Sequence, residues 1–331
     1  MNEIKTIGII GSGKMGSDLF NYLSDFNFHL IWYTRNKEHQ DTLKKTFHKK
    51  IKRQLKHDII SHEIFNLKNG YQITHDIKDF ANCDLIIESI IEDTDVKVEL
   101  FRKLEKLVKS SCILASNSSS ILPSEISQDI KTKNRILGVH FFYPIALKNV
   151  VEVISSESTD EITIEKIKIF LDEIKRFYIV QNEHNAFILN RFLLQLQIRA
   201  LELMNKYELN FIQMDRVAKK IITEFGLFEM MDHVGHHTMY NAVLNYSRMD
   251  LDKKKYEPLL KELQGRKRDT GTHLFVNTED EVEEINIVRG KEILEELKIT
   301  ANRYFQIYSE ELQINMFSLK KSLGEFCGIM L

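Results

Sequence analysis

The sequence predicts an α/β protein, in which an N-terminal doubly wound sheet is followed by an all-α C-terminal domain. Apolar, strand-like runs alternate with amphipathic helical segments over residues 1–184, a pattern typical of a parallel sheet with helices on both faces. Over residues 185–331 helical periodicity dominates, and Pro258 is the only proline that interrupts it. A chain of 331 residues also exceeds the usual single core, so two domains are expected.

The elements of the first domain follow one another along the chain. Strands are predicted over residues 5–10, 29–34, 83–91, 112–116 and 178–181, with two more strand-like runs between Arg135 and Ile154. Helices are predicted over residues 15–26, 37–57, 96–108 and 161–177. The first strand, helix and second strand form a βαβ unit.

The composition argues against several classes of function. The 46 basic and 48 acidic residues give no overall field that would attract nucleic acid or a membrane. Cys83, Cys112 and Cys327 are too widely spaced for a metal or redox motif, so we expect no metal site and buried thiols in a reducing compartment. Because there is no signal peptide and no long apolar run, we expect a cytoplasmic location.

The segment GSGKMG follows a predicted strand and opens a predicted helix, which is the context of a dinucleotide-binding turn. In this GxGxxG pattern Gly11 permits the tight turn, Gly13 lets the backbone approach a pyrophosphate, and Gly16 allows the helix to pack closely on the strand. Lys14 and Met15 begin the helix whose N-terminus would face the phosphates. The domain is therefore predicted to be Rossmann-like.

The end of the second strand bears on the choice between NAD and NADP. This position ordinarily carries an acidic residue that accepts a hydrogen bond from the adenosine ribose. Here the strand ends Tyr33-Thr34-Arg35, without a carboxylate, and Arg35 can pair with a 2′-phosphate instead. We therefore expect an NAD(P) cofactor with a preference for NADP. The alternative is that Arg35 is a solvated surface charge.

A histidine and a glutamate form the candidate catalytic pair. His140 lies twelve positions before Glu152, across the two apolar runs that follow Arg135. Histidine titrates near neutrality and suits proton transfer, and a carboxylate on its second ring nitrogen would fix the tautomer. The alternative is a core histidine with a purely structural role beside Phe141 and Phe142. A nucleotide site followed by such a pair suggests a dehydrogenase.

Several motifs together resemble the L-3-hydroxyacyl-CoA dehydrogenase family, over residues 4 to about 271. They are GSGKMG, IIESIIEDTDVKVELF, ILASNSSS, RILGVHFFYP, NVVEVI and FILNRFLL. The resemblance implies a Rossmann-like domain, a helical domain that usually dimerises, and oxidation of an acyl thioester alcohol at C3. Members of the family mostly use NAD, which is opposite to the preference indicated by the end of the second strand.

The resemblance also implies a catalytic set. His140 matches the family's base and Glu152 its carboxylate partner. Ser119 matches a serine of the family's SNTSS run, and Asn190 matches the asparagine of its NR pair. A serine hydroxyl and an asparagine amide at these positions could hydrogen-bond the reacting oxygen or the thioester carbonyl.

Further matches concern the cofactor and the substrate. Glu92, Lys97 and Ser119 fall on cofactor-contacting positions, whereas Tyr143 replaces an asparagine that usually approaches the cofactor. The basic helix over residues 37–57 matches a region that lies near the CoA 3′-phosphate in the family. Its candidate substrate contacts are Lys49, Lys50, Arg53 and Lys56. A solvated basic face explains these charges equally well.

Three functions remain open from the sequence: an enzyme on CoA thioesters, a relative that acts on carrier-bound acyl groups or free hydroxy or sugar acids, and a non-catalytic nucleotide-binding protein. The retained catalytic set argues against the third. If the protein is an enzyme on CoA thioesters, its reaction is expected to belong to fatty acid metabolism.

The C-terminal segment resembles an earlier part of the helical domain. The run that starts at Arg191 is similar to the run that starts at Lys291, with Ala200 and Ala301 in matching places. Both runs continue through a further helix to a glycine, Gly226 in one and Gly328 in the other. Residues 276–331 are thus a candidate partial second repeat, although any two amphipathic helix pairs look alike. We expect this tail to dock against the helices that start at Arg191, and we favour a homodimer over a monomer.

Overall fold

The computed structural model describes residues 3–222, 225–250, 252–266, 275, 284–314 and 316–328. The chain divides into two compact units, Met1–Ala186 and Phe187–Leu331. The first unit contains a sheet flanked by helices, and the described part of the second unit is helical. These observations confirm the fold class predicted from the sequence.

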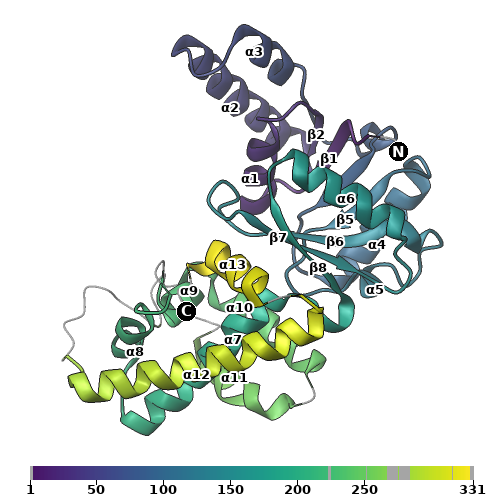
Figure 1. The fold of residues 1–331 in the computed structure, drawn as a ribbon. Coiled ribbons are helices and arrows are strands. Elements are labelled where there is room, and N and C mark those ends of the chain that lie inside the picture. The colour runs from purple at the N-terminus through teal and green to yellow at the C-terminus, as the bar shows by residue number, and fades with distance from the viewer. Residues whose placement is uncertain are drawn as a thin grey trace. The chain divides into compact units, whose positions relative to one another are not determined.

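The first unit is built on an eight-stranded sheet with the order β3-β2-β1-β4-β5-β6-β7-β8 (Figure 1). The strands are β1 (Thr6–Ile10), β2 (His29–Tyr33), β3 (Gln72–Thr74), β4 (Leu85–Glu88), β5 (Ile113–Ser116), β6 (Ile136–Phe141), β7 (Val150–Ser155) and β8 (Phe177–Asn182). The chain runs outward from β1 to β3 and then returns past β1 to β4. The carboxyl ends of β1 and β4 therefore flank the switch point at which ligands bind in sheets of this kind.

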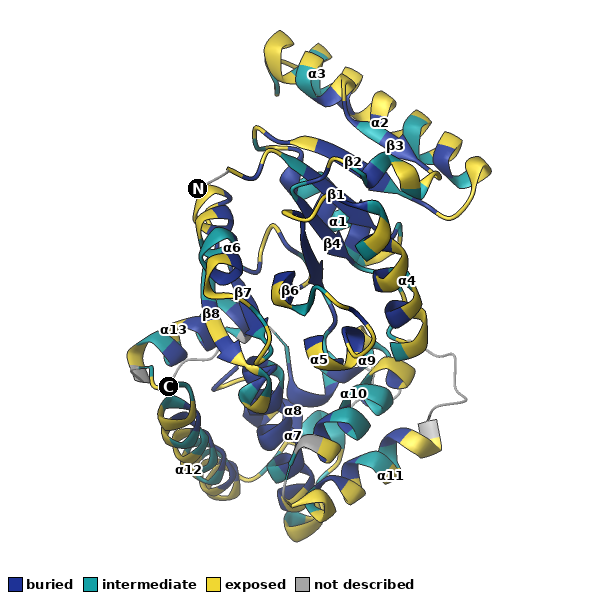
Figure 2. Ribbon diagram, turned by 90° about the vertical axis from the view of Figure 1, so that its right-hand side faces the viewer, coloured by how far each residue is buried: buried dark blue, intermediate teal, exposed yellow. Residues whose placement is uncertain are grey.

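Two apolar cores cover the two faces of the sheet. The helices of this unit are α1 (Lys14–Leu23), α2 (Lys37–Lys56), α3 (His62–Asn69), α4 (Thr94–Leu107), α5 (Pro123–Ile126) and α6 (Glu161–Glu173). On one face, Ile9 of β1 packs in a cluster with side chains of α1, α2 and α6. On the other face, Ile10 packs with side chains of α4 and α5. The central strands are buried and the outer helix faces are exposed, as Figure 2 shows.

One pair of neighbouring strands departs from the predicted parallel arrangement. β6 and β7 pair in antiparallel fashion, with His140 opposite Glu152. Only eight residues, 142–149, connect them, and a parallel connection needs a crossover of about a dozen residues or more. The expectation of an all-parallel sheet was therefore wrong at this one position.

Several boundaries also differ from those predicted. The strand expected over 83–91 is confined to β4, and the helix expected over 161–177 ends at Glu173, because Lys175 adopts a left-handed conformation (φ 56°) and β8 begins at Phe177. The sequence did not reveal α3 or the three-residue strand β3. The long basic helix was correctly predicted as α2. It forms a helical pair with α3 beside the β2 and β3 end of the sheet (Figure 1).

The second unit consists of helices in its described part. They are α7 (Ile188–Tyr207), α8 (Phe211–Ala218), α9 (Leu227–Val234), α10 (His236–Met249), α11 (Glu257–Arg266), α12 (Ile287–Leu312) and α13 (Met316–Cys327). The buried stripe of α12 includes Ile293, Leu297, Ala301 and Phe305, which recur at helical spacing. α12 packs along α7, where the rings of Phe305 and Phe192 lie 4.7 Å apart.

The structure shows which helices the two runs of the candidate repeat form. α7 and α12 are the long helices of the two runs, and Ala200 and Ala301 are both fully buried. Gly226 and Gly328, which end the two runs in sequence, differ: Gly226 precedes α9 with φ −68°, whereas Gly328 follows α13 with φ 68°. Of the candidate repeat, residues 276–283, 315 and 329–331 lie outside the described residues.

Among the described residues, no helix combines the length and the apolar character needed to span a membrane.

Candidate active site

The glycine-rich turn after β1 has the geometry that a dinucleotide requires. Gly11 has φ 124°, and a Cβ atom there would lie 2.2 Å from the carbonyl oxygen of Ser89. A Cβ atom on Gly16 would lie 2.1 Å from the carbonyl oxygen of Gly11, so only glycine lets α1 approach β1 this closely. A Cβ atom on Gly13 would meet nothing within 4 Å. The backbone beside Gly13 thus borders open space, and the turn fits a pyrophosphate.

Lys14 and Met15 begin α1, and their side chains lie in different environments. Lys14 is exposed, and its ammonium lies 4.1 Å from the centre of the Tyr143 ring. Met15 packs against the core that α1 shares with the sheet. Tyr143 follows β6, precedes a cis peptide bond to Pro144 and is 45% exposed. The structure therefore brings together two of the residues assigned to the cofactor, one at the start of α1 and one after β6.

The residues that follow β2 form a polar cluster instead of an acidic ribose contact. Thr34 is buried, and its Oγ1 lies 2.8 Å from Nδ1 of His39 and accepts a hydrogen bond of 3.1 Å from the hydroxyl of Ser12. Arg35 is exposed. Sequence reasoning singled out Thr34 and Arg35 but missed Ser12 and His39, because nothing in the sequence indicates that the first turn of α2 reaches the glycine-rich turn.

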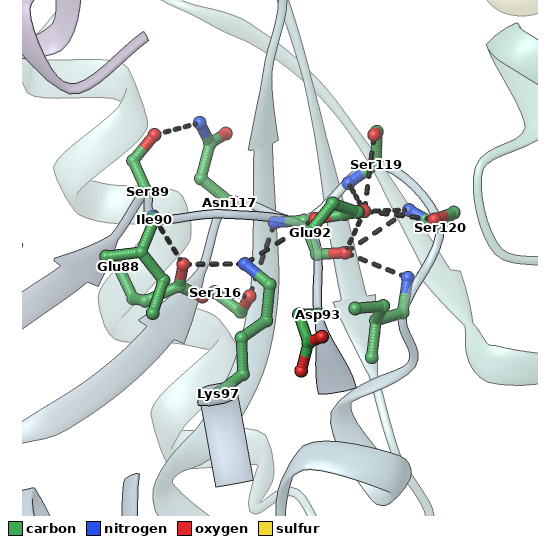
Figure 3. A network of polar contacts seen from close by, with 12 residues as sticks. Glu88, Ser89, Ile90, Glu92, Asp93, Lys97, Ser116, Asn117, Ser119 and Ser120 are labelled. Atoms are coloured by element: carbon green, nitrogen blue, oxygen red, sulfur yellow. Dashed lines mark hydrogen bonds and ion pairs between the residues drawn. The ribbon is translucent and has the colours of Figure 1, made fainter. Parts of the chain in front are cut away.

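Glu92 and Lys97 belong to a buried network at the carboxyl ends of β4 and β5 (Figure 3). Lys97 Nζ lies 2.6 Å from Glu88 Oε1 and 3.5 Å from Glu92 Oε2. Glu88 is fully buried and also accepts a hydrogen bond from the Ser116 hydroxyl. Burial pushes the pKa of Glu92 upward, but the Lys97 ammonium and the hydrogen bonds from residues 118–120 outweigh it and hold that pKa below its usual range.

Ser119 lies in the loop after β5, which is folded around the carboxylate of Glu92. The backbone N–H groups of Ser119 and Ser120 each donate to Glu92 Oε1 at 3.0 Å, and the Ser118 hydroxyl donates to the same atom at 2.6 Å. In Figure 3 the carboxylate of Glu92 lies between Lys97 and the loop that carries Ser119 and Ser120. The acid that the sequence assigned to the cofactor therefore also holds the loop that carries a candidate catalytic serine.

His140 and Glu152 form a buried pair. They face each other across the antiparallel ladder of β6 and β7, and His140 Nδ1 lies 2.7 Å from Glu152 Oε2. Glu152 is fully buried, and its other oxygen accepts a hydrogen bond of 2.9 Å from Gln181 Nε2 on β8. The sequence predicted the pair but not Gln181, because β8 reaches β7 only after a helical crossover. The alternation along β8 places Gln181 among buried positions and is the one signal that could have indicated it.

An asparagine connects the strand ends on which these groups lie. Asn117, directly after β5, accepts a hydrogen bond of 2.7 Å from the backbone N–H of Phe141 and donates one of 3.2 Å to the Ser89 hydroxyl. Phe141 is the neighbour of His140, and Ser89 directly follows β4. The ends of β4, β5 and β6 are thus tied together, which brings the cofactor residues and the His140 strand into one region of the first unit.

Asn190 lies near the start of α7 in the second unit. Its Nδ2 donates a hydrogen bond of 3.1 Å to the hydroxyl of Tyr246 on α10. The ring of Tyr246 in turn lies 6.1 Å from that of Phe187, which precedes α7. Within this unit the side chain of Asn190 is therefore oriented by a neighbouring helix.

The four basic residues of α2 that were assigned to the substrate, Lys49, Lys50, Arg53 and Lys56, are exposed. Lys49, Arg53 and Lys56 recur at helical spacing, and Lys50 Nζ donates to Asn21 Oδ1 of α1 at 2.7 Å. Desolvation and the neighbouring Lys68 ammonium lower the pKa of Lys50. An ammonium that is destabilised by a like charge gains more from a bound anion than a fully solvated one.

No group of three or more histidine, cysteine, aspartate or glutamate side chains within the described ranges could hold a metal ion.

Comparisons with known proteins agree on one family. Residues 6–184 match the model of the 3-hydroxyacyl-CoA dehydrogenase NAD binding domain, and residues 187–272 match that of the C-terminal domain. A 3-hydroxybutyryl-CoA dehydrogenase of Bradyrhizobium diazoefficiens is 27% identical over 257 residues, which cover 77% of this chain and 87% of the relative. A putative fatty acid oxidation complex trifunctional enzyme of Rickettsia prowazekii is 25% identical over 349 residues, 99% of this chain and 47% of the relative.

Two solved structures share the fold. The 3-hydroxybutyryl-CoA dehydrogenase of Escherichia coli matches with a TM-score of 0.74 and 20% identity, over 87% of this chain and 63% of that one. The dehydrogenase part of a multifunctional enzyme of Caenorhabditis elegans matches with a TM-score of 0.60 and 24% identity, over 98% of this chain and 79% of that one.

The chain belongs to the 3-hydroxyacyl-CoA dehydrogenase family, since the two family models together cover most of its length. It is thus an oxidoreductase that uses NAD and acts on a CH–OH group. This confirms the resemblance deduced from the motifs.

Proposed function

We propose that the protein interconverts a 3-hydroxyacyl thioester, with CoA as the thiol, and the 3-ketoacyl thioester. One observation carries this proposal: a buried histidine–carboxylate pair, His140 and Glu152, next to the carboxyl ends of a sheet that also carries a dinucleotide turn. The names of the relatives, which include 3-hydroxybutyryl-CoA dehydrogenases, support the substrate class.

In the proposed mechanism the chain moves one proton and orients two oxygens. When bound, the dinucleotide would supply the hydride chemistry at C3, as hydride acceptor for the alcohol and hydride donor for the ketone. His140 Nε2 takes the proton of the 3-hydroxyl group, and Glu152 stabilises the imidazolium through Nδ1. The Ser119 hydroxyl and the Asn190 amide would hydrogen-bond the reacting oxygen and the thioester carbonyl, which carry negative charge in the transition state.

For the cofactor we propose NADP in preference to NAD. The Thr34 position lacks a carboxylate, and Arg35 directly after it is exposed and able to pair with a 2′-phosphate. The pyrophosphate would lie beside Gly13, with Lys14 and Tyr143 at its edge. Arg35→Ala should lower the ratio of kcat/KM for NADPH to that for NADH, and an unchanged ratio would contradict the preference. Thr34→Asp should favour NADH, since a carboxylate accepts from the ribose hydroxyls and repels a phosphate.

For the thiol part of the substrate we propose that Lys49, Lys50, Arg53 and Lys56 form an exposed basic surface for the phosphates of CoA. Desolvation and the Lys68 ammonium lower the pKa of Lys50, and a bound phosphate would offset both by stabilising the charged ammonium. Lys50→Ala should raise KM for a CoA thioester while leaving kcat within about twofold. Lys52→Ala, also exposed on α2 but outside the proposed set, is the matched control.

The assembly and the location are also proposals. We propose a homodimer through the helical unit, as the resemblance to the family implies, with the tail altering the contact surface. We propose a cytoplasmic location, in keeping with the free, buried thiols of Cys83 and Cys112. Size-exclusion chromatography with light scattering tests the first proposal, and fractionation of the source cells tests the second.

Absorbance at 340 nm with acetoacetyl-CoA and each reduced cofactor tests the central proposal. Turnover that is lost in His140→Gln, together with retained nucleotide binding, is the expected result. Turnover with a carrier-bound acyl group or a free hydroxy acid alone would contradict the CoA assignment. Nucleotide binding without turnover of any of these substrates would contradict the enzymatic role.

A further inference from the structure

We propose that Lys14 and Tyr143 act as a pair on the bound dinucleotide. The Lys14 ammonium is the cationic ligand of the pyrophosphate, and Tyr143 is a positioning residue whose ring holds that ammonium, 4.1 Å from the ring centre. The pairing exists because Tyr143 stands where the family usually carries an asparagine, which has no aromatic face. The inference rests on the dinucleotide part of the proposed function and applies to NAD and NADP alike.

The contact joins two strand ends that are not neighbours in the sheet. Lys14 begins α1, four positions after the end of β1, and Tyr143 is the second residue after β6. β4 and β5 lie between β1 and β6 in the strand order, which separates the outer two strands by about 14 Å. A dinucleotide lies across the carboxyl ends of the strands at the switch point, so both side chains border its place in the first unit.

The loop that carries Tyr143 is anchored on α1 at a second point. Asp18 Oδ2 accepts a hydrogen bond of 2.6 Å from the backbone N–H of Ile145. Asp18 lies four positions after Lys14, so the two side chains leave the same face of α1. The ring of Tyr143 therefore has a defined place relative to the start of α1, and it gives the Lys14 ammonium a defined place as well.

The charge of Lys14 is not neutralised. Among the described residues Lys14 makes no ion pair and no hydrogen bond, and its contact is with the face of an aromatic ring. The one carboxylate of α1, Asp18, accepts the loop N–H, while Glu88 and Glu92 face Lys97. An aromatic ring attracts an exposed ammonium less strongly than a phosphate, which forms charge-assisted hydrogen bonds with it. The ring thus orients the cation and leaves it available to an anion.

The first turn of α1 presents no group that competes for a phosphate. Gly13, its N-cap, makes no side-chain hydrogen bond to the helix N–H groups, and no acidic residue lies in the first turn. N–H groups at a helix N-terminus attract phosphate oxygens, and the open space beside Gly13 admits them. Of the three residues that open the helix, Lys14, Met15 and Gly16, only Lys14 adds a charge to these dipoles.

The test measures the dissociation constant of NADH by nucleotide fluorescence in the full chain, without an acyl substrate, and uses ADP-ribose and adenosine as competitors. ADP-ribose keeps the pyrophosphate and lacks the nicotinamide, whereas adenosine lacks both. The variants are Lys14→Met, Tyr143→Leu, Tyr143→Phe, and Lys14→Met combined with Tyr143→Leu. Lys5→Met is the matched control, because it removes an exposed ammonium at the opposite end of β1. Thermal melting verifies that each variant is folded.

Lys14→Met should weaken the binding of NADH and of ADP-ribose about tenfold, because a charge-assisted hydrogen bond to the pyrophosphate is lost. The affinity for adenosine should stay within about twofold of the wild type. Tyr143→Leu should weaken NADH about threefold, and Tyr143→Phe, which keeps the ring, should match the wild type. In the Lys14→Met background Tyr143→Leu should have no further effect, since the ring acts through the ammonium.

An NADH affinity of Lys14→Met equal to that of Lys5→Met would overturn the role of the ammonium. Equal losses from Tyr143→Leu in the two backgrounds would overturn the role of the ring, since Tyr143 would then contact the cofactor on its own. A Tyr143→Phe variant as weak as Tyr143→Leu would do the same, because it would assign the effect to the hydroxyl group.

Binding and turnover together separate this pair from the proposed function. The losses expected for Lys14→Met, in a protein that turns over no acyl thioester, would contradict the proposed function and leave the role of Lys14 and Tyr143 standing. Turnover of acetoacetyl-CoA by a protein whose NADH affinity is unchanged in Lys14→Met would support the proposed function and overturn the pairing.

Discussion

The contact between Gln181 and Glu152 predicts how a conservative change of the carboxylate should act. Gln181 Nε2 donates to Glu152 Oε1 at 2.9 Å, and the other oxygen faces His140 Nδ1 at 2.7 Å. In Glu152→Gln the new amide oxygen would accept the Gln181 hydrogen bond, which directs the amide NH₂ group at His140. That group donates to Nδ1, so the ring proton moves to Nε2 and the ring can no longer accept a proton there.

The expected loss is large because the wrong tautomer disables the base and the imidazolium also loses its counter-charge. We expect kcat to fall about 10³–10⁴-fold, which corresponds to about 4–5.5 kcal/mol of transition-state stabilisation. Both directions of the reaction should be affected, since the imidazolium is the proton donor of the reverse step. Cofactor affinity should stay within about twofold of the wild type, because the pair acts on the hydroxyl group.

The reciprocal exchange, Glu152→Gln with Gln181→Glu, provides the sharper test. A carboxylate at position 181 would accept from the amide at position 152, whose oxygen then faces His140 and restores the proton on Nδ1. We expect kcat of this double variant to be at least about tenfold higher than kcat of Glu152→Gln, measured at 340 nm with acetoacetyl-CoA. A double variant as inactive as the single one, with the fold intact by thermal melting, would refute the role given to Gln181. So would a Glu152→Gln variant that keeps more than about a tenth of wild-type turnover.

Two further predictions concern stability. Lys97→Met should destabilise the first unit by about 3–5 kcal/mol in urea unfolding, because Glu88 would keep a fully buried charge without its ammonium partner. Adding Glu88→Gln should restore most of this loss, and a purely additive double variant would contradict the pairing. Burial raises the pKa of Asp215 from 3.8 to about 6, so the folded state disfavours its charged form. Stability should therefore fall by about 3 kcal/mol as pH rises from about 4 to above 6, the product of about two pKa units and 1.36 kcal/mol. Asp215→Asn should abolish this part of the pH dependence, and an unchanged profile would show that Asp215 does not titrate there.

The parts of the site that the sequence predicted are those set by local pattern. The GxGxxG turn needs only a strand, three glycines and a helix, all within a dozen residues. The pairing of His140 with Glu152 follows from two adjacent strands joined by a short connection, which puts them opposite each other in the ladder. In both cases the interacting groups are close in the chain, so spacing alone limits the arrangements.

The parts that could not be predicted depend on segments that meet only in the fold. Gln181 reaches Glu152 across 29 positions, and His39 reaches Ser12 across 27. The alternation along β8 indicates at most that Gln181 is buried and does not reveal its partner, and the contact of His39 leaves no periodic signal. β3 was missed for a different reason: three residues at a sheet edge are too few to show alternation.

The tail allows a prediction from packing alone. Phe305 and Phe192 are both fully buried, one on each side of the contact between α12 and α7. Further along the same two helices, Arg199 of α7 pairs with Glu296 of α12 at 2.9 Å. Phe305→Ala should cost about 3–5 kcal/mol of unfolding free energy, the usual range for a buried phenylalanine, whereas Phe317→Ala, an exposed residue of α13, should cost less than about 0.5 kcal/mol. Removing residues 276–331 uncovers the apolar stripe of α7, which then has to be buried elsewhere. The shortened chain should therefore self-associate or lose solubility when its mass is measured by light scattering. The truncated protein could instead stay soluble, with the same number of chains per assembly and the same unfolding free energy as the full chain. That result would show that α12 is a peripheral appendage and does not cover α7.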